Sequence, residues 1–163
     1  AFVDSAVKDL AVESASTPKF TMGGLKKGGT GSTALITYAG ALRNALNANS
    51  PSVDTKDALE HFSDFIQGTN TKALARVREV GEAYRNTTTA LALIPVPEEL
   101  QYAHVQLLNS CDALAVATLS LAKADTDPLL AFIGLQQYDT AHSGTAQSAL
   151  DVGKILSAGI LQN

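Results

Sequence analysis

This chain is poor in cysteine and in charge, and each shortage limits what it can be. Cys111 is the only cysteine, so no disulfide can form within the chain. Charged residues make up 17% of its 163 residues, compared with about 25% in an average globular protein. Alanine and uncharged polar residues largely take their place. We therefore expect one ordinary-sized domain with a neutral, polar surface and a core that needs no covalent cross-link.

Basic residues are especially scarce in the second half. From residue 86 to the end the chain has two basic and seven acidic residues, a net charge of −5. Proteins that bind nucleic acids need clustered lysine and arginine to displace counterions. Acidic side chains interrupt the one basic cluster, which contains Lys72, Arg76, Arg78, Glu79, Glu82 and Arg85. This pattern predicts a solvated, salt-bridged helix face and no nucleic-acid partner.

The chain also lacks a long apolar run. It has no uninterrupted stretch of 18 apolar residues, so we expect no transmembrane span, and a membrane anchor would have to lie upstream of residue 1. The sequence starts with Ala1 and its only methionine is Met22, as expected after removal of a signal peptide or after other trimming. We expect an exported or envelope-associated protein, although the residues leave a cytoplasmic location open.

The most regular feature is a seven-residue spacing of leucines in a nearly uncharged stretch. Residues seven apart return to the same side of a helix. Residues 87–124 carry only four charges, so a helix from Pro97 to about Lys123 should be the central packing element. We call its repeating side the seam, and it consists of Leu100, His104, Leu107, Cys111, Leu114, Thr118 and Leu121.

Apolar periodicity and capping residues predict five further helices and no convincing strand. The predicted helices are 1–15, 33–48 with Ser32 as N-cap, a third from Ser52 or Asp54 to Gln67, 70–93, and 128–161 with an interruption at Ser143-Gly144. Their expected inward sides include Leu35, Ala39, Leu42 and Leu46, then Leu59, Phe62 and Ile66, then Ala131, Leu135, Tyr138 and His142. We expect an all-α, elongated up-down bundle of five to six helices, three of them long.

A glycine-rich stretch separates the first predicted helix from the rest. Five glycines occur between Gly23 and Gly31, which predicts a flexible linker over residues 17–32. The division is then residues 1–32, a short helix plus linker, and 33–163, the bundle. A glycine loop before a helix can also hold phosphate, but here the lysines precede the glycines and no strand leads in, so we favour the linker.

No group of residues predicts catalysis or metal binding. His104 and Cys111 lie two turns apart, about 10 Å along a helix, so they cannot share one metal ion. We interpret them as a core histidine and a core thiol. The pairs His61 with Asp57 and His142 with Asp139 are common by chance. Adjacent Glu98 and Glu99 diverge and suit a helix start. We expect no catalytic residues, no cofactor and no metal.

The end of the chain is apolar on more than one side. Such a segment packs into its own core, meets another subunit or, less readily, contacts a membrane surface. The residues that we single out as a partner surface are Ile155, Leu156, Ile160 and Leu161.

Residues 70–140 contain two short motifs that resemble a known group of proteins. The first is Val96-Pro97 followed by Leu100, His104 and Leu107-Leu108-Asn109, and the second is Asp127-Pro128-Leu129 followed by Ala131 and Tyr138. In this respect the chain resembles uncharacterised helical proteins of ultrasmall bacteria that are predicted to be exported. The resemblance implies an envelope location and carries no activity.

Three hypotheses follow for function. The first is a non-enzymatic, exported helical module that binds other proteins or copies of itself. The second is a small-ligand sensor or carrier, in which small residues leave room between helices. Those residues are Ala103, Ala115, Ala117, Gly134 and Gly153. The third is a hydrolase that uses His61 or His104. We favour the first.

Overall fold

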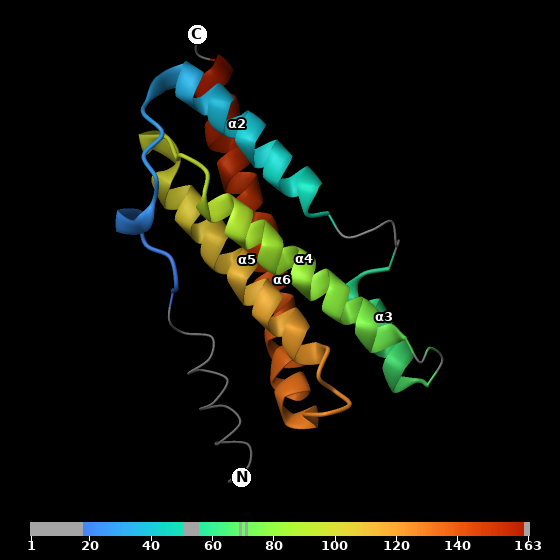
Figure 1. The fold of residues 1–163 in the computed structure, drawn as a ribbon. Helices are drawn as coiled ribbons and strands as arrows, with labels where there is room; N and C mark the ends of the chain where they lie inside the picture. The colour runs from blue at the N-terminus through green and yellow to red at the C-terminus, as the bar shows by residue number, and fades with distance from the viewer. Residues whose placement is uncertain (1–17, 51–55, 69, 71, 162–163) are drawn as a thin grey trace.

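The computed structural model describes residues 18–50, 56–68, 70 and 72–161 (Figure 1). Within these residues the chain forms five α-helices and two 3₁₀-helices, and its one β-type contact is an isolated parallel bridge between Lys27 and Val96. The prediction of an all-α fold is therefore confirmed. The predicted helix over residues 1–15 lies outside the described residues.

The α-helices range in length from 9 to 34 residues. The 3₁₀-helices are η1 (Met22–Gly24) and η2 (Glu98–Leu100). The α-helices are α2 (Gly31–Ala48), α3 (Ala58–Ile66), α4 (Ala73–Ala92), α5 (Gln101–Leu121) and α6 (Pro128–Leu161). Successive members of the α4, α5 and α6 series run in opposite directions, as predicted for an up-down bundle (Figure 1).

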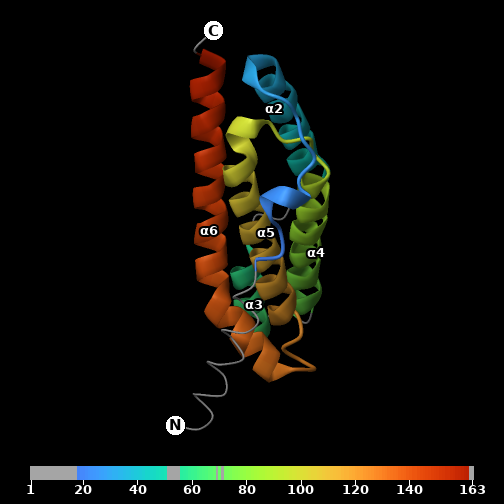
Figure 2. The ribbon, with the colours of Figure 1, turned by 90° about the vertical axis from the view of Figure 1, so that its left-hand side faces the viewer.

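Helix α5 occupies the middle of the bundle. It packs against α4 on one side and α6 on the other (Figure 2). Two shorter helices complete the bundle at different points along its length. Helix α2 packs against α4 and α6, and α3 packs against α4 farther along. The core correspondingly has two clusters, one around Tyr38, Leu91 and Leu108 and one around Val77 and Leu121.

Local signals placed several helix ends correctly. Asp127 accepts a hydrogen bond from the Leu130 N–H at 3.0 Å, and α6 begins at Pro128, as predicted. Gly68 has a φ of +68°, which suits the residue just beyond a helix end. The predicted interruption at Ser143-Gly144 is wrong, since α6 continues through both residues.

Two predicted N-caps are wrong. Helix α2 has Thr30 as its N-cap rather than Ser32, because Gly31 already belongs to the helix. Helix α3 has Asp57 as its N-cap rather than Ser52 or Asp54. Asp57 and Glu60 form a reciprocal capping box, in which each carboxylate accepts the other residue's backbone N–H at 2.8 Å.

The predicted inward sides also need correction. Leu46, Ile66 and Leu135 are 45%, 66% and 40% exposed, and His142 is exposed as well. On α2 the deeply buried residues are Leu35 and Tyr38, which are three apart, so α2 is rotated from the predicted stripe. Ile66 is the last residue of α3, where the helix ends.

The glycine-rich stretch is not a free linker where the structure describes it. The Gly28 N–H donates to the Val96 carbonyl at 2.8 Å, and the Val96 N–H donates to the Lys26 carbonyl at 2.7 Å. A Cβ at Gly28 would lie 2.8 Å from backbone atoms of Pro95 and Val96. Glycine is needed here because the two chain segments approach closely.

Candidate functional site

The seam forms the interior of the bundle. All of its side chains are buried, with exposures between 0% and 7%. Leu100 comes from η2 and the remaining six from α5. Small residues beside the seam allow close helix contact rather than space, since a Cβ at Gly134 would lie 2.7 Å from the Ala117 carbonyl oxygen. The seam is therefore a packed core at this point.

His104 links three helices through its two ring nitrogens. Its Nε2 lies 3.1 Å from the Leu91 carbonyl oxygen at the end of α4, and its Nδ1 lies 2.8 Å from the Tyr38 hydroxyl of α2. A carbonyl oxygen only accepts, so Nε2 carries the hydrogen and Nδ1 accepts from Tyr38. Tyr38 and His104 also meet edge to face, with 5.5 Å between their ring centroids.

The electrostatic setting of the seam keeps both of its titratable side chains neutral. Burial lowers the pKa of His104, and the hydrogen bond to the Leu91 carbonyl only partly opposes this effect. Burial raises the pKa of Cys111 to about 11. The thiolate is the reactive form of cysteine, so at neutral pH Cys111 is an unreactive thiol. His104 is 0% exposed and both of its nitrogens are engaged, so it offers no free atom to a substrate.

Three of the other candidate ligands, Asp57, His61 and His142, take part in local structure. The Asp57 carboxylate caps α3, and His61, one turn later, is 3% exposed. His142 stacks on Tyr138 with 5.9 Å between ring centroids. Among the residues that the structure describes, no three or more histidine, cysteine, aspartate or glutamate side chains form a group able to hold a metal ion.

The glycine loop is closed by a carboxylate of the protein itself. Glu99 Oε1 accepts the Gly31 N–H at 2.8 Å, and the Glu98 N–H donates to the Gly29 carbonyl at 3.0 Å. The hydrogen bond from Gly31 lowers the pKa of Glu99. An incoming phosphate would have to displace this carboxylate from the start of α2, where the helix dipole favours negative charge.

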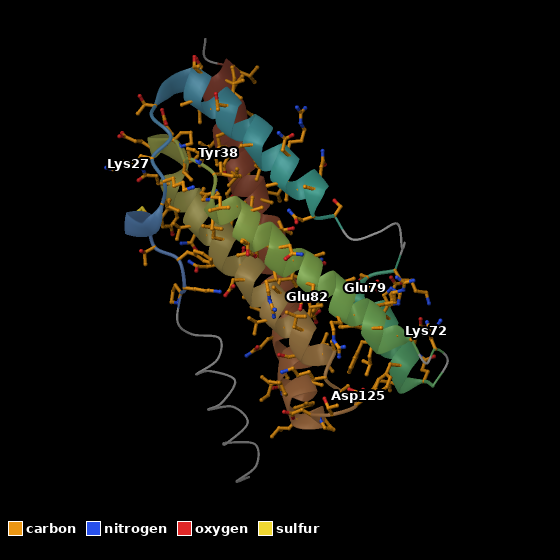
Figure 3. All side chains as sticks on the ribbon, viewed as in Figure 1. Lys27, Tyr38, Lys72, Glu79, Glu82 and Asp125 are labelled. Carbon is orange, nitrogen blue, oxygen red and sulfur yellow. The ribbon has the colours of Figure 1, made fainter. Side chains whose placement is uncertain are left out.

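The basic cluster on α4 is a salt-bridged face, as its spacing indicates. Arg76 pairs with Glu79 at 2.6 Å, and Arg85 pairs with Glu82 at 3.4 Å. Glu79 and Glu82 project from α4 (Figure 3). Arg78, Glu79 and Glu82 help to line a surface hollow of about 550 Å³ between α4 and the end of α2.

The apolar end of the chain is divided between core and surface. Ile155, Leu156 and Ile160 are partly buried and pack against the core cluster around Tyr38. Leu161 is 83% exposed. Ile155 also helps to line a hollow of about 480 Å³ near the start of α2. Most of the predicted partner surface therefore packs inward.

Large apolar side chains that the apolar periodicity did not single out lie on the side of α6 that faces away from the core. Leu129, Phe132 and Leu150 are 51%, 50% and 60% exposed. Most of α6 runs along one edge of the bundle, and its first turns curve inward toward the end of α5 (Figure 2). Helical spacing carries a signal for this side, because Phe132 and Leu150 share one position about 120° around the helix from the buried Tyr138, at about 100° per residue.

No protein-family model, no curated protein and no solved structure matches this chain. Within the described residues, no helix combines the length and the apolarity needed to cross a membrane.

Proposed function

We propose that this chain is a non-enzymatic, exported helical module of the cell envelope that acts by binding protein surfaces, above all those of its own copies. The observation that carries the proposal is the outer side of α6, where Phe132, Leu150 and Leu161 stay at least half exposed. Exposed large apolar residues on one helix face are typical of interaction surfaces.

The interior supports a structural rather than a catalytic role. His104 holds α2, α4 and α5 together, and Cys111 packs as a small apolar residue. Catalysis needs such groups to reach a substrate, and both are enclosed by the bundle. The close contact at Gly134 favours this function over a ligand carrier, since small seam residues there bring helices together.

The envelope location rests on the sequence resemblance described above. Cell fractionation tests it directly. We expect the native protein, made from its own gene, to be found with the envelope, and recovery in the cytoplasmic fraction would contradict this part of the proposal.

Light scattering over a range of protein concentrations tests the interaction function. We expect the average mass of the wild-type protein to rise with concentration. Combining Phe132→Ser with Leu150→Ser should abolish the rise, because it removes two exposed apolar side chains of α6. Ile36→Ser is the matched control, since Ile36 is 57% exposed on α2. A wild-type protein that stays strictly monomeric at the highest concentration would refute self-association.

A further inference from the structure

We propose that the outer face of α6 pairs in antiparallel fashion with the same face of a second copy, around a two-fold axis near Ala146 and Gln147. This inference rests on the proposed function and names both the partner and the register. In a two-fold contact, the same surface patch on both copies must be complementary to itself. The residues of α6 satisfy this requirement.

The outer face of α6 is a continuous stripe of exposed residues. Its members follow one another at spacings of three and four, and every one of them is exposed. They are Phe132, Gln136, Asp139, Ser143, Ala146, Leu150, Lys154, Ser157 and Leu161. From first to last they cover about eight helical turns at about 3.6 residues each, so they recur on the same side of the helix.

Charge selects the pairing. Helix α6 has three charged residues in 34, and two of them, Asp139 and Lys154, lie on the outer face. When two copies run antiparallel with Ala146 near the axis, Asp139 of each copy faces Lys154 of the other. Two opposite-charge contacts then form, one on each side of the axis.

The same register matches the remaining positions. Phe132 falls opposite Leu161 of the second copy, so the two large apolar ends of the face cover each other. Ser143 falls opposite Leu150, and the small Ala146 lies at the centre, where the two backbones come closest. The exposures of Phe132, Leu150 and Leu161 are 50%, 60% and 83%, so pairing removes apolar surface from water at both ends.

A parallel arrangement is electrostatically unfavourable. It places Asp139 against Asp139 and Lys154 against Lys154, and like charges across an interface disfavour association. Within one copy Lys154 contacts Asp151 at 3.1 Å, but both side chains are well exposed, at 71% and 48%. Such a surface pair contributes little, so Lys154 remains available to a second copy.

Charge reversal tests the register. The variants are Asp139→Lys, Lys154→Glu and the two combined, with Asp125→Lys and Lys123→Glu as matched reversals at exposed positions outside the face. In sedimentation velocity, the dimer dissociation constant of each single face variant should be about tenfold higher than that of wild type, because each variant loses two exposed ion pairs per dimer. The double variant should regain wild-type association, and the two controls should behave like wild type.

The outcomes separate the register from the function. If wild type associates but the double variant does not recover, or if the controls weaken association as much as the face variants do, the antiparallel register is wrong while self-association stands. If wild type never associates, both proposals fail. Circular dichroism should show that the helices of each variant are intact, because all of the changes lie at exposed positions.

A cross-link locates the axis independently. In the proposed dimer the two Ala146 residues lie near each other across the axis, so Ala146→Cys should give a disulfide-linked dimer under mild oxidation. Ala113→Cys, at an exposed position on α5, is the matched control and should stay monomeric. The native Cys111 is buried and should not interfere. Equal cross-linking by both variants would overturn the placement of the axis.

Discussion

Helices α5 and α6 are packed against each other, yet they treat apolar residues differently. Neighbouring helices enclose α5 on most sides, so four of its five leucines are buried and Leu119 is partly buried. Helix α6 contacts α5 and α2 on one side only, and apolar residues on its other side remain in water. Apolar content alone therefore does not distinguish a core helix from an edge helix, because burial depends on how many sides of the helix its neighbours cover.

Matched leucines on the two helices give the largest expected contrast. Leu107 on α5 is 4% exposed and Leu150 on α6 is 60% exposed. Leu107→Ala should lower the free energy of unfolding by about 2–5 kcal/mol, because it leaves a cavity in the core. Leu150→Ala should change it by less than about 0.5 kcal/mol. Urea denaturation measures both, preferably at protein concentrations where the chain is monomeric. Similar losses would contradict the contrast between the helices.

Two glycines within α6 differ in the same way, one against α5 and one facing open space. A Cβ at Gly134 would meet the Ala117 backbone at 2.7 Å, whereas nothing lies within 4 Å of one at Gly153. Gly134→Ala should destabilise the protein by about 2–3 kcal/mol through overpacking. Gly153→Ala should stabilise it by up to about 1 kcal/mol, because alanine favours helix. Thermal unfolding gives the signs, and stabilisation by both changes would show that α6 does not pack closely against α5.

Removing one hydroxyl tests the link between α2 and the interior. Tyr38→Phe keeps the ring but leaves Nδ1 of the buried His104 without a donor. The cost should be about 1–2 kcal/mol of unfolding free energy, the penalty for an unsatisfied buried acceptor. Tyr102→Phe is the control, since Tyr102 is 69% exposed and should lose nothing measurable. Equal stability of both variants in urea would argue against the hydrogen bond.

The smallest expected effect is a pH dependence confined to the interior. The pKa of His104 is lowered in the folded state from 6.5, so the unfolded chain binds its proton more readily. The contribution of neutral His104 to stability is therefore complete above pH 6.5 and is lost as the pH falls through the folded-state pKa. Comparing urea midpoints at about pH 7.5 and about pH 5 should show a larger drop for wild type than for His104→Gln.

His104→Ala separates the structural interpretation from catalysis. Because the ring ties α2 and α4 to α5, its removal should lower helicity or unfolding temperature. An activity lost while helicity and stability stay unchanged would instead make His104 a catalytic residue.

Much of the fold follows from short-range patterns. The end of α3 just before Gly68 and the start of α6 at Pro128 depend on residues within one turn, so the sequence predicts them. The cap of α2 depends on a distant residue. Glu99 supplies its carboxylate from 68 positions away, and Gly31, with a φ of +83°, lets the helix begin earlier than at Ser32.

Burial in the candidate site and on the α6 surface likewise depends on distant residues that the sequence pattern does not identify. The burial of His104 follows from its place in the leucine spacing, but its partner Tyr38 depends on how α2 is rotated against α5. On α6 both Tyr138 and Phe132 have helical apolar neighbours, and only the packing of α5 and α2 determines which side faces water. Periodicity finds helices, whereas their rotation is a property of the assembled bundle.

Hydrogen exchange measured at low and high protein concentration shows whether α6, and not α5, forms the contact between copies, because both helices are followed within one sample. We expect peptides from α6, residues 128–161, to exchange more slowly at high concentration, while peptides from α5 do not change. Unchanged exchange in α6 across the whole range, or added protection only in helices other than α6, would contradict the assignment of its outer face as the contact surface.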